Sequence, residues 1–160
     1  MKPKILNSFE MTLPARSENE RFARQAVSAF AAALDPTIEE LADLRTAVSE
    51  AVTNCIVHAY RGAQWKTAAN GQKARIYISA KVSEDGRLTV RIRDKGCGME
   101  DVERCRMPLY TTDETGERGG MGFAIMESFT DAIRVLSKPG RGTTVTLVKK
   151  FSGEMSEMKD

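Results

Sequence analysis

The sequence predicts an α+β fold in which helices cover one face of a mixed, mainly antiparallel sheet, giving a two-layer α/β sandwich. Two observations lead to this prediction. Strand-like alternation of apolar and polar residues recurs about five times along the chain, whereas three longer segments place their apolar residues at helical spacing. The central and the last pairs of strands are each joined by a short glycine-containing turn, which favours antiparallel neighbours.

The first part of the chain is predicted to form one strand and two helices. Residues from Phe9 to Leu13 alternate, as in a half-buried strand. Ser17 and Glu20 have the spacing of a capping box, which predicts that a helix begins there. Asp35-Pro36-Thr37 separates this helix from the next one. The apolar stripes are expected at Phe22, Ala26, Val27, Phe30 and Leu34 and then at Leu41, Leu44, Val48, Ala51, Val52 and Cys55.

The rest of the chain is predicted to form a hairpin, two further helices and a second hairpin. Two alternating runs, 76–82 and 88–92, meet at the Glu84-Asp85-Gly86 turn. Segment 61–73 has no clear period and is interpreted as a loop. The remaining elements are expected as a short helix over 100–106, a helix over 121–129, and strands over 132–136 and 143–149.

Size and composition set the broad class of the protein. The length of 160 residues predicts a single domain over 1–151, followed by a polar tail over 152–160 that we expect to be disordered. The net charge of +2 is too small to indicate direct nucleic-acid binding. No apolar run is long enough to cross a membrane, so we expect a cytoplasmic protein. The three cysteines, Cys55, Cys97 and Cys105, indicate neither a disulfide framework nor a zinc site.

Two clusters of polar and glycine residues suggest a binding site. Glu50 and Asn54 are four residues apart on a predicted helix, so their side chains share one face. Asp94 ends a predicted strand and is followed by Gly96 and Gly98, which places a carboxylate beside backbone that a ligand can approach closely. Taken singly, the first cluster also fits a solvated helix face, and the second also fits a tight turn.

Two further glycine clusters follow. The segment Arg118-Gly119-Gly120-Met121-Gly122-Phe123 leads into a predicted helix, where free backbone N–H groups and the helix dipole favour an anion. Gly140-Arg141-Gly142-Thr143-Thr144 joins the last two strands and by itself indicates only a hairpin. The P-loop and Rossmann fingerprints and the protein-kinase signatures are absent from the sequence.

The four clusters together, in this order, resemble the ATP-binding (Bergerat) fold that gyrase, histidine kinases and MutL share, over Ser49 to Leu147. Further segments make the chain similar to the anti-sigma F factors of spore-forming bacteria over almost its whole length. These segments are Ala15 to Glu20, Leu34 to Thr37, Ser49 to Asn54, Pro108 to Thr112 and Gly120 to Phe123. Between Tyr60 and Arg75 the chain is longer than is usual in that family.

The resemblance implies a role for each matching residue. Glu50 would be the catalytic base toward the hydroxyl that attacks ATP, and Asn54 would help to hold Mg²⁺. Asp94 would accept a hydrogen bond from the adenine amino group, with Gly96 and Gly98 beside the base and Thr143 assisting. Segment 108–119 would be the ATP lid. The remaining nucleotide-binding residues would be Thr111, Thr112, Arg118, Gly120, Met121, Gly122 and Phe123.

The resemblance also implies partners. The protein would sequester sigma factor F, phosphorylate a serine of an anti-anti-sigma antagonist with ATP, respond to ATP or ADP occupancy, and form a homodimer. Arg24, on the first predicted helix, would contact the partners. Two alternatives remain open at this point. One is the sister kinase that controls a general-stress sigma factor, and the other is a nucleotide-sensing module without transfer activity.

Overall fold

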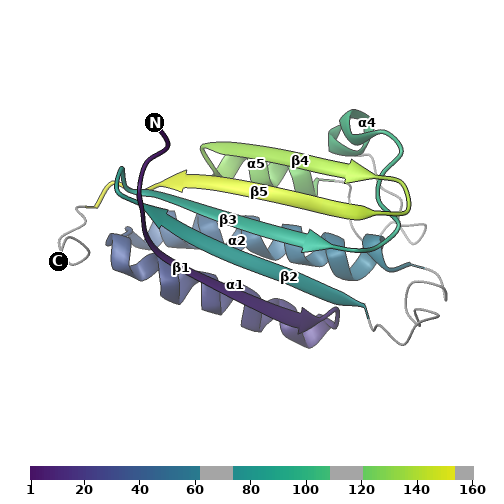
Figure 1. Ribbon diagram of the computed structural model, residues 1–160, viewed down its shortest axis with the longest axis horizontal. Coiled ribbons are helices and arrows are strands. Elements are labelled where there is room, and N and C mark those ends of the chain that lie inside the picture. Colours follow the sequence, from purple (N-terminus) through teal and green to yellow (C-terminus); the bar gives the residue numbers. More distant parts are fainter. Residues whose placement is uncertain (62–73, 109–120, 154–160) are drawn as a thin grey trace.

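The structure is a computed structural model that describes residues 1–61, 74–108 and 121–153. Its elements follow one another in the order that the periodicity predicts (Figure 1). They are β1 (Ile5–Pro14), α1 (Ser17–Ala31), η1 (Ala32–Leu34), α2 (Ile38–Asn54), η2 (Cys55–Ala59), β2 (Arg75–Ser83), β3 (Arg87–Asp94), α4 (Val102–Arg106), α5 (Gly122–Phe129), β4 (Ala132–Lys138) and β5 (Gly142–Lys150). Among the described residues, no helix has both the length and the apolar character needed to cross a bilayer.

The sheet has the strand order β1-β2-β3-β5-β4, and all four pairings are antiparallel. Helices α1, α2 and α5 lie against one face of it, so the molecule has two layers (Figure 1). The predicted α+β sandwich is therefore confirmed. Segments 62–73 and 109–120, which include the predicted loop and most of the predicted lid, lie outside the described residues.

The core forms where the inward residues of the central strands meet the helices. Val90 of β3 is paired with Ala80 on one side and with Leu147 on the other, and all three are almost fully buried. The intervening residues, such as Arg91, point to the other face, as strand alternation requires. Each large apolar side chain buried in this way contributes about 1.5–3 kcal/mol.

Helix α1 buries only part of the apolar stripe that the sequence predicts. Val27 and, in η1, Leu34 are buried as predicted and Phe30 packs against the core, whereas Phe22 is 58% exposed. The other buried residues of α1 are small, namely Ala23, Ser28 and Ala31. The predicted capping box at Ser17 is also wrong. Arg16 is the N-cap of α1, and its side chain makes no capping bond. The Glu20 carboxylate accepts hydrogen bonds from Ser49 and Arg24 and not from the backbone at Ser17.

A capping box exists at the start of α2 instead. The Thr37 hydroxyl accepts from the Glu40 N–H at 3.1 Å, and Glu40 accepts from the Thr37 N–H at 2.9 Å. The same carboxylate accepts from the Ser152 N–H at 2.9 Å. The chain after β5 is thereby held against the start of α2 as far as the described residues extend.

Helix α2 continues beyond Asn54 as one π-helical segment, η2. Of the predicted stripe, Leu44, Val48, Ala51 and Val52 are buried, Leu41 is partly buried against the core, and Cys55 extends the stripe into η2; Ala47 is buried in addition. Because a π-helix has more residues per turn than an α-helix, the side chains after Asn54 point in different directions from those of a continued α-helix. Segment η2 ends at Ala59, and Tyr60 caps it beside the cavity described below.

Thr37→Ala should lower the free energy of unfolding by about 1 kcal/mol, because the Glu40 N–H loses its acceptor. Urea denaturation followed by circular dichroism measures this change. The matched control is Ser17→Ala at the start of α1, where no side-chain cap is present; it should stay within about 0.5 kcal/mol of the wild type. A larger loss for Ser17→Ala than for Thr37→Ala would contradict this account of the helix starts.

Candidate functional site

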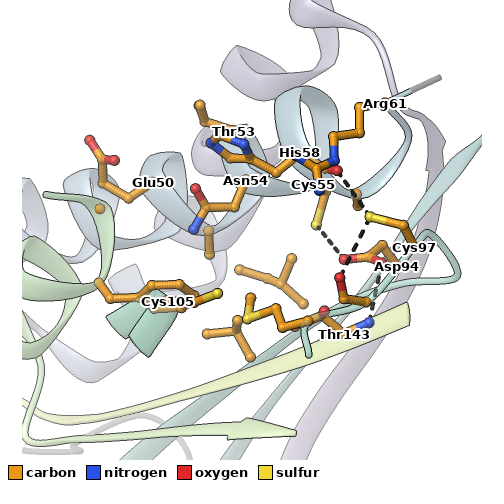
Figure 2. A pocket seen from close by; sticks show the side chains of 18 of the residues that line it. Glu50, Thr53, Asn54, Cys55, His58, Arg61, Asp94, Cys97, Cys105 and Thr143 are labelled. Carbon is orange, nitrogen blue, oxygen red and sulfur yellow. Dashed lines mark hydrogen bonds between the residues drawn. The ribbon is translucent and has the colours of Figure 1, made fainter. Parts of the chain in front are cut away.

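A cavity of about 500 Å³ opens between the end of α2 with η2, the ends of β3 and β5, and helices α4 and α5. Figure 2 shows Asp94 and Thr143 at one end of the cavity and Glu50 at the other, with Asn54 between them. The volume lies in the range that small-molecule and cofactor sites occupy. Polar groups therefore converge on a pocket large enough for a ligand.

Asp94 is the most deeply buried acid of the site, with only 4% of its surface exposed. Its Oδ1 accepts from the Gly96 N–H at 2.9 Å and from the Thr143 N–H at 3.2 Å. The Cys55 thiol donates to Oδ2 at 3.6 Å, a weak bond. One carboxylate oxygen is thus satisfied by backbone, while the other keeps acceptor capacity on the cavity side.

Burial dominates the electrostatics at this end of the cavity. It raises the pKa of the Asp94 carboxyl above its ordinary value of 3.8, although the hydrogen bonds from Gly96, Thr143 and Cys55 oppose the shift. Burial and the neighbouring Asp94 together raise the pKa of the Cys55 thiol well above its ordinary value, so Cys55 is a neutral donor. Cys55 therefore supports the carboxylate without adding a charge.

The glycines around Asp94 are required by close packing between protein segments. A β-carbon on Gly96 would lie 2.0 Å from Ala59 O, and one on Gly98, whose φ is +71°, would lie 2.0 Å from Lys138 O. Gly142 has φ +87° and approaches the backbone of Asp94 in the same way. The turn after β3 is thus held between η2 and the β4–β5 turn.

Two polar residues support this end of the cavity that the sequence alone does not predict. The Tyr60 hydroxyl donates to Arg75 O at 2.5 Å and accepts from the Lys95 N–H at 2.8 Å, and burial raises its pKa to about 12. Ser137 Oγ lies 2.8 Å from Thr143 Oγ1 and accepts from the Met99 N–H. Neither residue belongs to a motif, and their roles depend on pairings distant in sequence.

The other end of the cavity brings Glu50 and Asn54 to the start of α5. Both side chains project from one face of α2, as their spacing predicts, and both line the cavity. A β-carbon on Gly122 would lie 3.1 Å from Glu50 Oε2 and 3.6 Å from Asn54 Oδ1. The first N–H groups of α5, which have no partner within the helix, therefore lie beside these two residues.

The structure gathers most of the predicted site residues that it describes. Those that line the cavity are Glu50, Asn54, Asp94, Gly98, Met121, Gly122, Phe123 and Thr143. Gly96 does not line it but donates its N–H to Asp94. Thr111, Thr112, Arg118 and Gly120 lie outside the described residues. The cavity also contains Met99 and Cys105, which the motifs do not predict.

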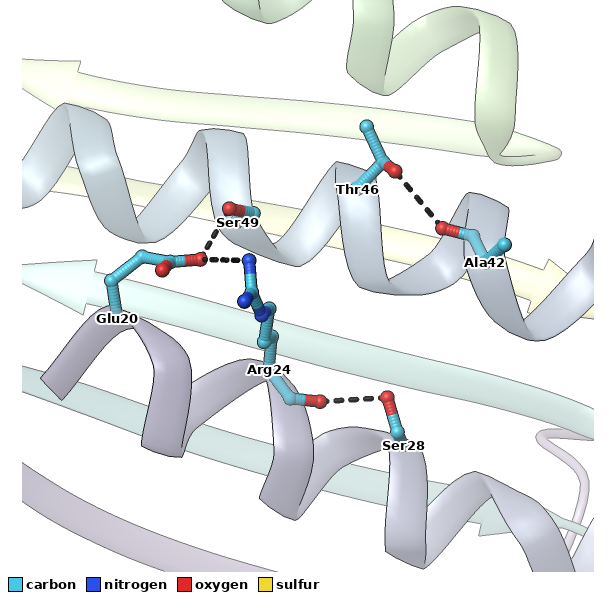
Figure 3. A network of polar contacts seen from close by, with 6 residues as sticks. All are labelled: Glu20, Arg24, Ser28, Ala42, Thr46 and Ser49. Atoms are coloured by element: carbon cyan, nitrogen blue, oxygen red, sulfur yellow. Dashed lines mark hydrogen bonds and ion pairs between the residues drawn. The ribbon is translucent and has the colours of Figure 1, made fainter.

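Arg24 lies away from the cavity, on α1 where it faces α2. Its guanidinium donates to Glu20 at 3.3 Å, and Glu20 also accepts from Ser49, the residue before Glu50 (Figure 3). One third of the Arg24 side chain is exposed, yet its Nε is buried without a hydrogen-bond partner among the described residues. A short polar network thus joins the first helix to the one that carries Glu50.

Comparison with known proteins identifies the fold family. The family model described as a histidine kinase-like ATPase domain matches residues 13–149. An anti-sigma F factor of Pasteuria penetrans is 49% identical over 145 residues, which are 91% of each chain. The chain belongs to the anti-sigma F factor family. A second member, from Caldanaerobacter subterraneus subsp. tengcongensis, is 48% identical over 89% of this chain and 93% of its own.

Solved structures agree with the fold of this family. A structure of RsbU and RsbW domains from Mycobacterium tuberculosis superposes with a TM-score of 0.63 at 22% identity, over 91% of this chain and 32% of the other. The SiaB–SiaC complex from Pseudomonas aeruginosa contains a chain with a TM-score of 0.55 at 15% identity, over 90% of this chain and 89% of its own. At these identities the similarity shows the shared architecture.

Membership of an ATPase family implies nucleotide binding, and the cavity fits that ligand. Asp94 offers a buried acceptor to an amino-bearing base at one end, and the start of α5 offers backbone donors to an anion at the other. Among the described residues, no group of three or more His, Cys, Asp or Glu side chains is arranged to hold a metal ion. An Mg²⁺ ion bound through one side chain and the phosphates of a nucleotide needs no such group.

Asp94→Asn should change how the stability of the nucleotide-free protein depends on pH. Because the folded state binds the Asp94 proton more tightly than the unfolded chain does, ionisation of this group destabilises the fold. The free energy of unfolding of the wild type should therefore fall, relative to the variant, as pH rises above about 4 and until the folded-state carboxyl is ionised. Urea titrations of both proteins across this range measure the difference. A difference in the free energy of unfolding that stays constant with pH, or that grows in favour of the wild type, would contradict the conclusion that burial outweighs the hydrogen bonds of Asp94.

Proposed function

We propose that the protein is an ATP-dependent serine kinase and an anti-sigma factor that sequesters sigma factor F. The antagonist of this interaction, an anti-anti-sigma protein, would be the phosphorylation substrate. Family membership supports the anti-sigma and kinase-like parts of the proposal. The structural observation that carries the transfer step is that Glu50 and Asn54 meet the start of α5 inside the cavity.

The reaction that this arrangement suits is phosphoryl transfer to a hydroxyl group. The serine oxygen would form a bond to the terminal phosphorus of ATP while the bridging P–O bond breaks and ADP leaves, and Glu50 would accept the hydroxyl proton. Such transfer depends mainly on positioning and charge neutralisation. Glu50 on the rigid α2 helix is suited to positioning, since α2 is anchored in the core by Val48 and Val52 on its opposite face.

Asn54 and the backbone of α5 would hold the phosphate end of the nucleotide. Asn54 would be the protein ligand of Mg²⁺, which supplies charge neutralisation at the phosphates when bound. Gly122 lets α5 begin directly against Glu50 and Asn54, since a β-carbon there would crowd the Glu50 carboxylate at 3.1 Å and touch Asn54 at 3.6 Å. Thr111, Thr112, Arg118 and Gly120 are proposed to complete this end from the lid segment.

The adenine end of the site would be formed by Asp94 and its supports. The carboxylate would accept from the adenine amino group through Oδ2, which has only the weak Cys55 donor among the described residues. Gly98 and Thr143 line the same end of the cavity. Gly96 would act through Asp94, because its N–H donates to the carboxylate and its α-carbon faces Ala59.

Arg24 is proposed as a contact for the protein partners. One third of its side chain is exposed and so can contact an acceptor on a partner, while the ion pair with Glu20 holds the guanidinium in place. The link from Glu20 to Ser49 places this contact one residue from Glu50 in the chain. We further propose that the protein acts in the cytoplasm as a homodimer, as the family resemblance implies.

The relatives support sigma factor F as the proposed partner. The matching curated proteins at 45–49% identity are named anti-sigma F factors, which favours sigma F over a general-stress sigma factor. A module that only senses nucleotide would not require a carboxylate beside the phosphate end. Glu50 at that position therefore favours the kinase over the non-catalytic alternative.

Glu50→Gln should lower the rate of phosphoserine formation on the antagonist at least about a hundredfold, because the amide cannot accept the hydroxyl proton. Labelled ATP and the purified antagonist measure the rate, and calorimetry measures ATP affinity, which should change less than about threefold. Asp94→Asn is the matched control at the other end of the cavity, and it should weaken ATP binding itself. Loss of ATP affinity in the Glu50 variant, or undiminished transfer, would contradict the role of Glu50.

Arg24→Glu should weaken binding of both sigma factor F and the antagonist by at least about tenfold, as for a partly buried arginine at an interface. Surface plasmon resonance with each purified partner measures the two affinities. Arg21→Glu is the control, because Arg21 is exposed on the same helix and gives the same change of charge. Equal effects of the two substitutions would show that Arg24 has no specific contact.

A further inference from the structure

The face of the sheet opposite the helices carries a concentration of positive charge. No helix lies across this face in the described part of the chain (Figure 1). Its residues alternate with the buried core residues of the same strands. Around the end of β3, along β4 and at the β4–β5 turn the exposed cations are Arg91, Arg93, Lys95, Arg134, Lys138 and Arg141, whereas Lys81, Arg87 and Lys150 lie farther away on the same face. On the described strands, Glu10 of β1 is the acidic residue that shares this face.

The cations are adjacent because of the register of the sheet. Arg91 is paired with Thr146, and Thr146 is paired with Arg134 on the next strand, so the two arginines flank one threonine. In the neighbouring row Arg93 is paired with Thr144 on β5, and Thr144 is paired with Leu136 on β4. Neighbouring strands lie about 4.8 Å apart, so Arg91 and Arg134, with one strand between them, stand about 10 Å apart. At low ionic strength exposed like charges at this distance repel one another weakly, and a negatively charged ligand would remove that repulsion.

These side chains surround a shallow hollow of about 640 Å³ at the end of β3 and the β4–β5 turn. Its wall includes Arg91, Arg93, Lys95, Lys138 and Arg141, so five cations converge on one depression. The chain as a whole has a net charge of only +2. The positive charge is thus not spread evenly, because six cations are gathered on this side of the sheet.

The charge is not neutralised within the described part of the molecule. Its ion pairs involve Arg24, Arg87 and Arg106, and none of the six cations of this face takes part in one. The only described partner of two of them is the ring of Tyr77, which lies 5.4 Å from the Arg93 guanidinium carbon and 4.8 Å from Lys95 Nζ. This ring orients the two cations without cancelling their charge.

We propose that this basic sheet face, defined by the six cations above, is a docking surface for a carboxylate-rich segment of a partner protein. Charge complementarity argues against a second copy of the chain, because two such faces would repel one another. Leu136, 52% exposed, and the Thr144 and Thr146 side chains lie between the cations. Leu136 offers an apolar contact to amino-acid side chains, which a phosphate backbone would leave unused, whereas the two hydroxyl groups can donate to either ligand.

The docking surface is separate from the proposed kinase site. The sheet lies between this face and Glu50, which is on α2 in the helical layer (Figure 1). The two sites adjoin only at the adenine end, where Asp94 and Thr143 contribute to the walls of both hollows. A protein seated here would leave the phosphate end of the cavity and the Arg24 network uncovered.

The test measures fluorescence anisotropy of a labelled peptide in which Glu alternates with Leu and Ala. The wild type should bind this peptide at low salt, more weakly at high salt, and should not bind the same peptide with Gln in place of Glu. The double variant Arg91→Glu/Arg134→Glu should bind about tenfold more weakly, since two favourable charge pairs become repulsive. Arg16→Glu/Arg21→Glu, with the same charge change on the helical side, should bind as the wild type does.

Four outcomes would overturn the proposal. The first is equal loss in both double variants, which would show a general effect of net charge. The second is equal binding of the Gln peptide. The third is tighter binding of a DNA duplex of matched charge, with the same loss in the Arg91→Glu/Arg134→Glu variant, which would make the face a nucleic-acid surface. The fourth is dimerisation of the wild type, measured by sedimentation, that the same variant abolishes.

Discussion

The buried carboxylate of Asp94 is the interaction on which the rest of the site depends. It joins the end of β3 to the following turn through Gly96 and to the start of β5 through Thr143. A carboxylate so deeply buried is costly unless it is hydrogen-bonded. The surrounding sequence meets this cost with a neutral thiol and with turns that approach closely, because Gly96, Gly98 and Gly142 carry no β-carbon. The shape of the cavity at this end follows from satisfying one charge.

The proposed activity arises from how far the two ends of the cavity are held apart. Asp94 is fixed by the sheet, whereas Glu50 and Asn54 are fixed by α2, and the packing of α2 on the sheet sets their relative position. When the adenine ring of a nucleotide binds at the Asp94 end, the length of the nucleotide places its phosphates at the other end, close to the start of α5. Positioning of this kind is the main contribution that a protein makes to phosphoryl transfer. The Glu20 link between α1 and Ser49 connects the proposed partner surface to the same helix.

Much of this architecture could be predicted from the sequence, because periodicity and turn chemistry are local. The central hairpin, α2 with its apolar stripe, and the pairing of Glu50 with Asn54 are all confirmed by the structure. The buried face of α1 was predicted only in part, because the helix buries the small residues Ala23 and Ala31 and leaves the larger Phe22 exposed. The prediction of a capping box at Ser17 was wrong because Glu20 accepts a hydrogen bond from Ser49 on helix α2. The roles of Tyr60 and Ser137 could not be predicted either, because their hydrogen bonds join residues that are far apart in the sequence.

We propose that Asp94 binds the amino group of a nucleotide base inside this cavity. Calorimetric titration of the wild type with ADP and with inosine diphosphate tests it most directly, because the second ligand carries a carbonyl where adenine has its amino group. We expect inosine diphosphate to bind about tenfold to a hundredfold more weakly, as expected for loss of a hydrogen bond to a buried charged acceptor. Equal affinity for the two nucleotides would contradict the claim.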